Sequence, residues 1–187
     1  MKDQAEILQR ITSALSSGRR DSASCIAAAE YPFTPSGNAG RSYTQLQALE
    51  IFIRDGFIDR YTGKRLVYPS VLYALANELP DRFPIGGGRS KSHSAHWDLF
   101  PTIDHLEPVS RGGKDDASNW VTTSMTMNMA KTSSTLEELS WRLHPEGSFD
   151  QWDGLCSWYR NYIVDHPYLA TAPFNKGWHT AFVRGFS

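Results

Sequence analysis

The spacing of apolar residues predicts a helical start to the chain. Apolar side chains recur at helical intervals over residues 3–16, which predicts an amphipathic helix. A second helix is expected to run from a cap at Asp21 or Ser22 to Ala29. The turn-rich stretch 31–40 then predicts a loop that separates these helices from the rest of the chain.

Capping residues and prolines mark two further helices. Thr44 is placed to cap a helix that runs to about Asp55, and Pro69 suits the first position of the next one. Between them, residues 59–67 predict a tight turn between two short extended pieces. Residues 84–92, with the sequence PIGGGRSKS, predict a flexible loop.

The middle of the chain predicts a strand, a loop, a second strand and a short helix. Runs of β-forming residues flank a polar Gly-Gly stretch, and the segment after them has no helix breaker. In chain order these four elements are expected at residues 100–109, 110–118, 120–124 and 125–131. Two more helices are expected, one after a cap at Ser134 or Thr135 and one over residues 150–165.

Composition and charge narrow this picture only a little. The 187 residues are 40% hydrophobic and 21% charged, which is typical of one globular domain. The formal net charge is −1, whereas a DNA-binding chain usually has a basic footprint. The two cysteines, Cys25 and Cys156, exclude a four-cysteine zinc site. With no signal peptide and no membrane span in the sequence, a cytoplasmic location is expected.

Residues 103–132 (IDHLEPVSRGGKDDASNWVTTSMTMNMAKT) bring together the groups that phosphodiester hydrolysis needs. The reaction takes a base that activates water and a cation that neutralises developing charge. His105 is the candidate base. Asp104 and Asn128 are candidate oxygen ligands for one divalent cation, Mg²⁺ or Mn²⁺ first and Ni²⁺ or Zn²⁺ as alternatives. Because neighbours on a strand point to opposite faces, Asp104 and His105 can serve one site only where the strand ends or twists.

Other residues are candidates for holding the site or the nucleic acid. Asn119 lies across the Gly-Gly loop from His105, where its amide can bind the loop backbone and keep two strands in register. Lys131 is expected on the same helix face as Asn128, near the scissile phosphate. Weaker candidates for contacts to nucleic acid are Arg60, His93 and Arg111, for which an ordinary polar side chain is the alternative reading.

This stretch resembles the signature of the HNH nuclease family. The matching positions, in order, are Asp104-His105, Pro108, Ser110-Arg111-Gly112-Gly113, Asn119 and Asn128-Met-Ala-Lys131. The variant has Asp before the base and Asn in place of the final His. The resemblance implies metal binding by Asp104 and Asn128, base catalysis by His105 and a loop-holding role for Asn119. The motif covers about 30 residues, about a sixth of the chain, so it implies no target sequence.

Many members of this family also bind a structural zinc through two cysteine pairs. The corresponding positions here are Asp59, Thr62, Ser124 and Met127. No cysteine pair is left, so no structural zinc is expected. Apolar packing of Met127 against Tyr61 and Leu66 is expected to replace it.

Together these observations predict an α+β fold. A ββα-metal core (HNH, or His-Me finger) at about 100–133 would be embedded in a mainly helical single domain over residues 1–187, with a helical part at about 1–55 and C-terminal helices at about 134–187. The expected activity is metal-dependent hydrolysis of DNA. The alternatives are a catalytically inactive HNH-fold module that binds nucleic acid and a nuclease that cleaves RNA. No membrane partner is expected. A homodimer is one option, because cutting both strands with one site often takes two copies.

Overall fold

The chain forms two compact units, described here one at a time. The computed structural model describes residues 4–30, 32 and 43–186. Contacts divide the chain into Met1–Arg41 and Ser42–Ser187, whereas a single domain was expected from the sequence. Apart from Pro32, the loop predicted over residues 31–40 lies outside the described residues. No helix among the described residues is long and apolar enough to cross a membrane.

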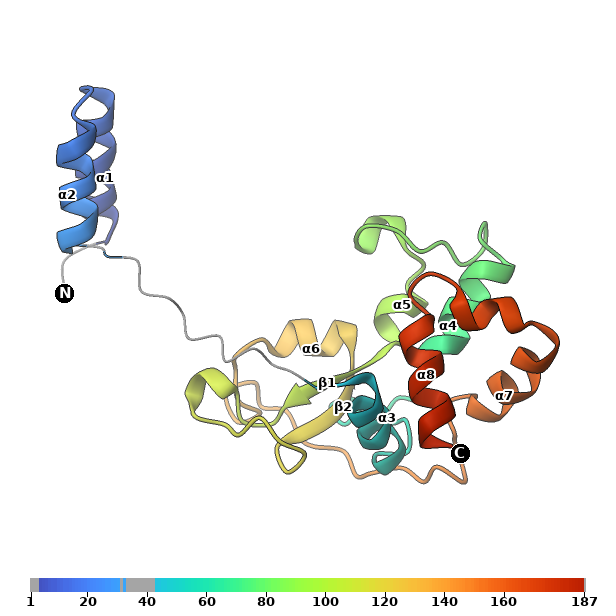
Figure 1. The fold of residues 1–187 in the computed structure, drawn as a ribbon. Helices are drawn as coiled ribbons and strands as arrows, with labels where there is room; N and C mark the ends of the chain where they lie inside the picture. Colours follow the sequence, from blue (N-terminus) through green and yellow to red (C-terminus); the bar gives the residue numbers. More distant parts are fainter. Residues whose placement is uncertain (1–3, 31, 33–42, 187) are drawn as a thin grey trace. The chain divides into compact units, whose positions relative to one another are not determined.

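The first unit contains a pair of helices that pack against each other (Figure 1). They are α1, Gln4–Ser16, and α2, Arg20–Glu30. Ile7 and Ala14 of α1 and Ala23 of α2 are buried. Both helices confirm the sequence prediction, with ends displaced by one or two residues. The pair thus buries apolar residues of its own.

The second unit is mainly helical, with a small antiparallel sheet (Figure 1). Its elements are α3 Gln45–Arg54, α4 Pro69–Glu78, α5 Ala95–Asp98, β1 Pro101–His105, β2 Trp120–Ser124, α6 Met125–Lys131, α7 Cys156–Asp165 and α8 Lys176–Gly185. Short 3₁₀ turns lie at Arg89–Lys91, Val109–Arg111 and Pro167–Thr171. The predicted mixed α+β, mainly helical fold is thus confirmed at this level.

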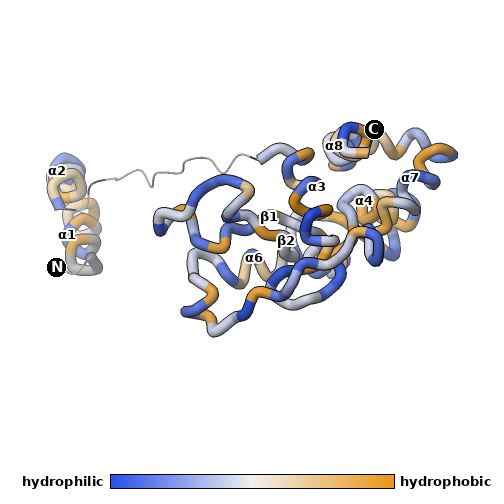
Figure 2. Tube along the Cα trace, turned by 90° about the horizontal axis from the view of Figure 1, so that it is seen from below, coloured by the Kyte–Doolittle hydropathy of each residue, from blue (hydrophilic) through white to orange (hydrophobic). Residues whose placement is uncertain are grey.

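The core of this unit lies between α3 and the helices around it. Leu49 and Phe52 of α3 are fully buried, and α8 packs on them through Trp178 and Phe182. The indole of Trp178 stacks on Phe52 with ring centroids 6.0 Å apart. Figures 1 and 2 show α4, α7 and α8 gathered on one side of the sheet. This apolar body supports the sheet from that side.

Two helices predicted in the C-terminal part are shorter in the structure than expected. Thr135 does form a reciprocal cap with Glu138, but the chain makes a single turn and leaves it at Ser140, where φ is +55°. The helix predicted over residues 150–165 starts only at α7, because Gly154 takes a φ of +64°. Left-handed backbone cannot continue a right-handed helix. The helix α8 lies within the region of C-terminal helices predicted at about 134–187, although its own bounds were not predicted.

Two buried carboxylates, those of Asp55 and Asp59, close the outer edge of β2. β1 pairs with the inner edge of β2 in antiparallel register. On the outer edge, Asp55 Oδ2 accepts from the Thr122 amide at 2.7 Å, and Asp59 Oδ2 accepts from the Ser124 amide at 3.1 Å. The Arg60 amide donates to the Thr122 carbonyl at 2.9 Å. The turn after α3 therefore satisfies an edge that would otherwise be unpaired.

The Asp59 carboxylate also joins chain segments that the motif alignment compared with the zinc-binding positions of HNH domains. Asp59 meets Ser124 through the hydrogen bond just described, and the Ser124 hydroxyl caps α6 by accepting from the Met127 amide at 3.2 Å. Asp59 also accepts from the amide of Tyr61 at 2.9 Å. Packing of Met127 against Tyr61 and Leu66 was expected here. The structure shows these polar contacts at the same place, and the apolar packing stays a prediction.

Removal of the Asp59 carboxylate should destabilise the second unit. Each lost hydrogen bond to a charged group costs about 1.5–3 kcal/mol. We expect Asp59→Ala to lower the free energy of unfolding in urea by about 3 kcal/mol. The exposed Asp81 provides the control, because Asp81→Ala should change stability by no more than about 0.5 kcal/mol. Equal stability of the two variants would contradict the role given to Asp59.

Candidate active site

His105 ends β1 and is held by a carboxylate. Its side chain is 3% exposed, and its Nε2 lies 2.7 Å from Asp115 Oδ1. A carboxylate only accepts hydrogen bonds, so Nε2 carries the proton in this contact. The Trp120 indole nitrogen lies 3.0 Å from the same ring nitrogen and 3.1 Å from Asp115 Oδ1. Because a protonated Nε2 cannot accept, the indole N–H donates to the carboxylate. In the neutral ring the lone pair is left on Nδ1, which is the nitrogen able to act as a base.

Asp115 is a residue that the sequence analysis missed. It lies ten residues after His105 in the Gly-Gly-Lys-Asp-Asp loop. The sequence does show two adjacent acids, Asp115 and Asp116, close to the candidate base. It does not show which of the two side chains points toward His105. Asp116 turns the other way and accepts from the Ser118 amide at 2.9 Å. Hydrogen bonds from Ser118 lower the pKa of Asp116 from its usual value.

Asn119 closes the loop between the two strands. Its Oδ1 accepts from the Glu107 amide at 2.9 Å, and its Nδ2 donates to the carbonyls of Glu107 and Lys114, both at 2.8 Å. These bonds tie the chain that follows β1 to the chain that precedes β2, as the loop-holding role requires. A side chain at Gly113 would overlap the Glu107 carbonyl, so the closed loop needs glycine there.

Asp104 belongs to a buried cluster on the opposite face of β1 from His105. The Tyr61 hydroxyl donates to Asp104 Oδ2 at 2.7 Å, and Lys131 Nζ lies 3.1 Å from the same oxygen. Lys131 is fully buried and also donates to the His105 carbonyl at 2.7 Å. Burial, followed by the charge of Asp104, raises the pKa of Tyr61, so its hydroxyl stays protonated and remains a donor.

Lys131 therefore has a different place from the one expected. Its ammonium points inward and does not offer a surface contact to a phosphate. It joins α6 to the end of β1 and balances the charge of Asp104. Asn128, one turn earlier on α6, is half-buried, and its Nδ2 donates to the Ile103 carbonyl at 3.3 Å. The structure thus brings Asp104 and Lys131 together and places His105 on the other face of the strand.

The oxygen atoms of Asp104 and Asn128 suit a hard divalent cation in kind. Among the described residues, both polar partners of Asp104 approach Oδ2, and Asn128 uses its nitrogen. One carboxylate oxygen and one amide oxygen remain, which are ligands that Mg²⁺ accepts together with water. Within the described part of the chain no three His, Cys, Asp or Glu side chains gather to hold a metal. The nearby ammonium of Lys131 repels a divalent cation, so we expect the metal ion to bind weakly.

The remaining candidates differ in accessibility. Arg60 is buried and hydrogen-bonds to Asp55, so the expected phosphate contact is corrected to a structural role. Arg111 is exposed and forms an ion pair with Glu138 at 2.6 Å. His93 accepts a hydrogen bond from the backbone at the start of α5. His93 is half-buried, so contacts of Arg111 and His93 to nucleic acid both stay predictions.

Comparisons of this chain with protein-family models, with curated proteins and with solved structures give no match. The HNH resemblance therefore rests on the motif of residues 103–132. The elements that carry this motif follow one another as strand, loop, strand and helix.

The buried ion pair of Asp104 and Lys131 should contribute to the free energy of unfolding. Removing one partner of a buried pair costs about 3–5 kcal/mol, whereas replacing both partners by apolar residues is often neutral. We expect Lys131→Met to lower the free energy of unfolding by about that amount. The double variant Asp104→Leu with Lys131→Met should recover at least half of the loss in the same urea titration. The exposed Lys64 serves as the control through Lys64→Met. A double variant no more stable than Lys131→Met alone would rule out the pairing.

Proposed function

We propose that residues of about 100–133 form a ββα-metal nuclease unit and that the chain hydrolyses phosphodiester bonds of DNA. The observation that carries this proposal is the contact of His105 Nε2 with Asp115 at the end of β1. A histidine oriented by a carboxylate presents its other nitrogen as a general base. Its position in the motif Asp-His…Asn…Asn supports phosphodiester hydrolysis above other reactions that use such a base.

Each side chain has one task in this reaction. Neutral His105 takes a proton from the attacking water at Nδ1, and Asp115 stabilises the imidazolium that forms. Lys131 is a positioning residue, because it holds the His105 carbonyl and the Asp104 carboxylate at once. A divalent cation held by Asp104 and Asn128 would neutralise the negative charge that develops on the phosphate and on the leaving oxygen. The family resemblance implies products with a 5′-phosphate and a 3′-hydroxyl.

A catalytically inactive nucleic-acid-binding module is the second candidate. The contact of Lys131 with Asp104 favours it, because the ammonium already balances the charge that a metal would need. In such a module the strands, loop and helix would keep the fold while the reaction is lost. The two candidates share the prediction of nucleic-acid binding and differ only in cleavage.

Cleavage of supercoiled plasmid with Mg²⁺ or Mn²⁺ separates the two candidates. We expect His105→Ala to reduce the rate by about 10²–10⁴-fold, the usual contribution of a general base. Asp115→Asn should also lower the rate, because the ring loses its orienting charge. Asp116→Asn removes a charge from the same loop without touching His105 and should cleave at the wild-type rate.

Chelation by EDTA should abolish cleavage by the wild-type protein. Equal cleavage by wild type and His105→Ala would contradict the assignment of the base. Binding of duplex DNA without cleavage under any metal would favour the inactive module. A parallel digest of structured RNA decides between DNA and RNA as the substrate.

A further inference from the structure

Trp120 lies directly across the sheet from the candidate base. His105 and Trp120 form the last pair in the antiparallel register of β1 and β2. Side chains of directly opposed residues lie on the same face of a sheet, close enough to contact each other. The centroids of the two rings are accordingly 6.4 Å apart, with an angle of 90° between the ring planes. Trp120 is only 6% exposed, so the sheet register places a buried indole in the wall around His105.

The indole nitrogen completes a triangle of polar atoms with His105 and Asp115. Trp120 Nε1 is 3.0 Å from His105 Nε2 and 3.1 Å from Asp115 Oδ1, and these last two atoms are 2.7 Å apart. An indole nitrogen only donates hydrogen bonds, and a carboxylate only accepts them. If the indole N–H donated to a bare Nε2, two acceptors would meet at 2.7 Å. Both N–H groups therefore converge on the same carboxylate oxygen.

A second donor matters at Asp115 because this carboxylate borders solvent. The side chain is 28% exposed and lies in the loop after the Gly-Gly pair, where water competes for the oxygen atoms. Hydrogen bonds to a charged acceptor are about twice as strong as those between neutral groups. The indole N–H thus helps to keep Asp115 Oδ1 against His105 Nε2.

Trp120 is itself fixed by contacts from two other segments. The Arg54 guanidinium, at the end of α3, donates to the carbonyls of Trp120 at 2.7 Å and of Ala117 at 3.0 Å. The Tyr43 ring packs edge-to-face with the indole, and the ring centroids are 5.9 Å apart. A residue held at its backbone and at its ring can impose an orientation on a carboxylate in a loop.

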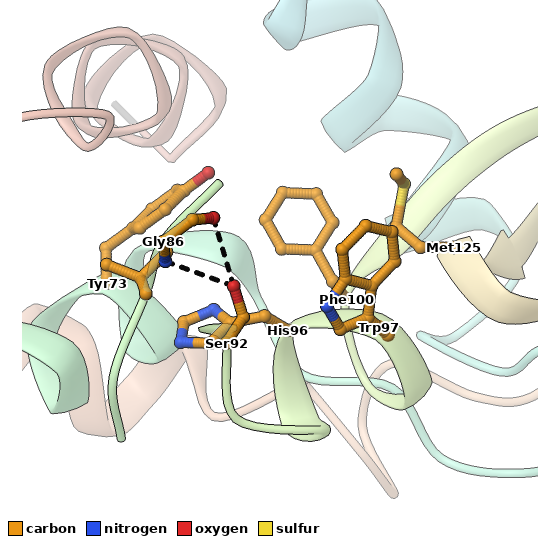
Figure 3. A pocket seen from close by; sticks show the side chains of 8 residues that line it. Tyr73, Gly86, Ser92, His96, Trp97, Phe100 and Met125 are labelled. Atoms are coloured by element: carbon orange, nitrogen blue, oxygen red, sulfur yellow. Dashed lines mark hydrogen bonds between the residues drawn. The ribbon is translucent and has the colours of Figure 1, made fainter. Parts of the chain in front are cut away.

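The indole of Trp97 provides a matched comparison. Figure 3 shows Trp97 beside Phe100 and Met125 in the wall of a small pocket. Its indole nitrogen is buried and has no hydrogen-bond partner among the described residues. Removal of this N–H therefore breaks no hydrogen bond in the described part of the chain, whereas removal of the N–H of Trp120 breaks the one to Asp115.

We propose that Trp120 is a positioning residue for the candidate base. Its indole N–H holds Asp115 in place, and Asp115 in turn keeps the His105 proton on Nε2 and the lone pair on Nδ1. The role requires the N–H as well as an aromatic ring, because a phenyl ring has no donor. The proposal rests on the proposed function only in taking His105 as the base, and the triangle of contacts can be tested without it.

Nuclear magnetic resonance of the ¹⁵N-labelled full chain tests this triangle without an assay of cleavage. The Trp120 indole N–H resonance is assigned by its loss in Trp120→Phe. We expect Asp115→Asn to move this proton resonance upfield, because a neutral amide oxygen is a weaker acceptor than a carboxylate. Asp116→Asn removes a charge from the same loop and should leave the resonance in place. An unchanged indole resonance in Asp115→Asn would overturn the proposal.

The ring nitrogens of His105 report the consequence for the base. At a pH where this ring is neutral, we expect the proton on Nε2 in the wild type and in Trp97→Phe. In Trp120→Phe the proton should divide between Nε2 and Nδ1. A tryptophan analogue with sulfur in place of the indole N–H, inserted at position 120, keeps the ring shape and should act as Trp120→Phe does. A proton that stays on Nε2 in both altered proteins would overturn the positioning role.

Cleavage kinetics separate this proposal from the proposed function. Trp120→Phe should lower kcat on plasmid by about tenfold, which equals about 1.4 kcal/mol in the barrier, and leave KM unchanged. Trp97→Phe should cleave as the wild type does. If the wild type shows the expected resonances but no cleavage, the nuclease proposal alone is refuted. If it cleaves while Asp115→Asn leaves the indole resonance in place, the positioning role alone is refuted.

Discussion

The architecture around the candidate site depends on the hydrogen bonds between two buried aspartates and the outer edge of β2. Asp55 and Asp59 accept from the amides of Thr122 and Ser124, which no other strand among the described residues satisfies. A two-stranded sheet alone is marginal in water, and an open edge invites pairing with other chains. With this edge closed, β2 can hold β1 in register, and β1 can end at His105. The carboxylates thus hold the turn after α3 against β2.

Much of this arrangement was predictable because it depends on local chemistry. The β-forming run of β2, the absence of breakers in α6 and the cap at Thr44 each predicted the element in its observed place. β1 is shorter than predicted, since pairing with β2 stops at His105. The motif also led to Asp104, Asn119 and Asn128, because residue types at fixed spacing are visible in a sequence.

What could not be predicted depends on partners distant in the chain. A lysine is almost always exposed, so the burial of Lys131 against Asp104 was not expected, and it follows from the contact of α6 with β1. The inward turn of Asp115 depends on loop closure by Asn119. This placement has a consequence for the proposed chemistry. The side chain of His105, the proposed base, lies on one face of β1 and that of Asp104 on the other, and Lys131 contacts the strand end that they share.

The central claim is that Asp104 and Asn128 hold a cation within reach of water activated by His105. Anomalous diffraction from crystals grown with Mn²⁺ and a short DNA duplex measures this most directly. The account predicts one Mn²⁺ bound by an oxygen of each of these two side chains, with a water between the phosphate and His105 Nδ1. Mn²⁺ bound elsewhere, or none at all with Lys131 still paired to Asp104, would contradict it.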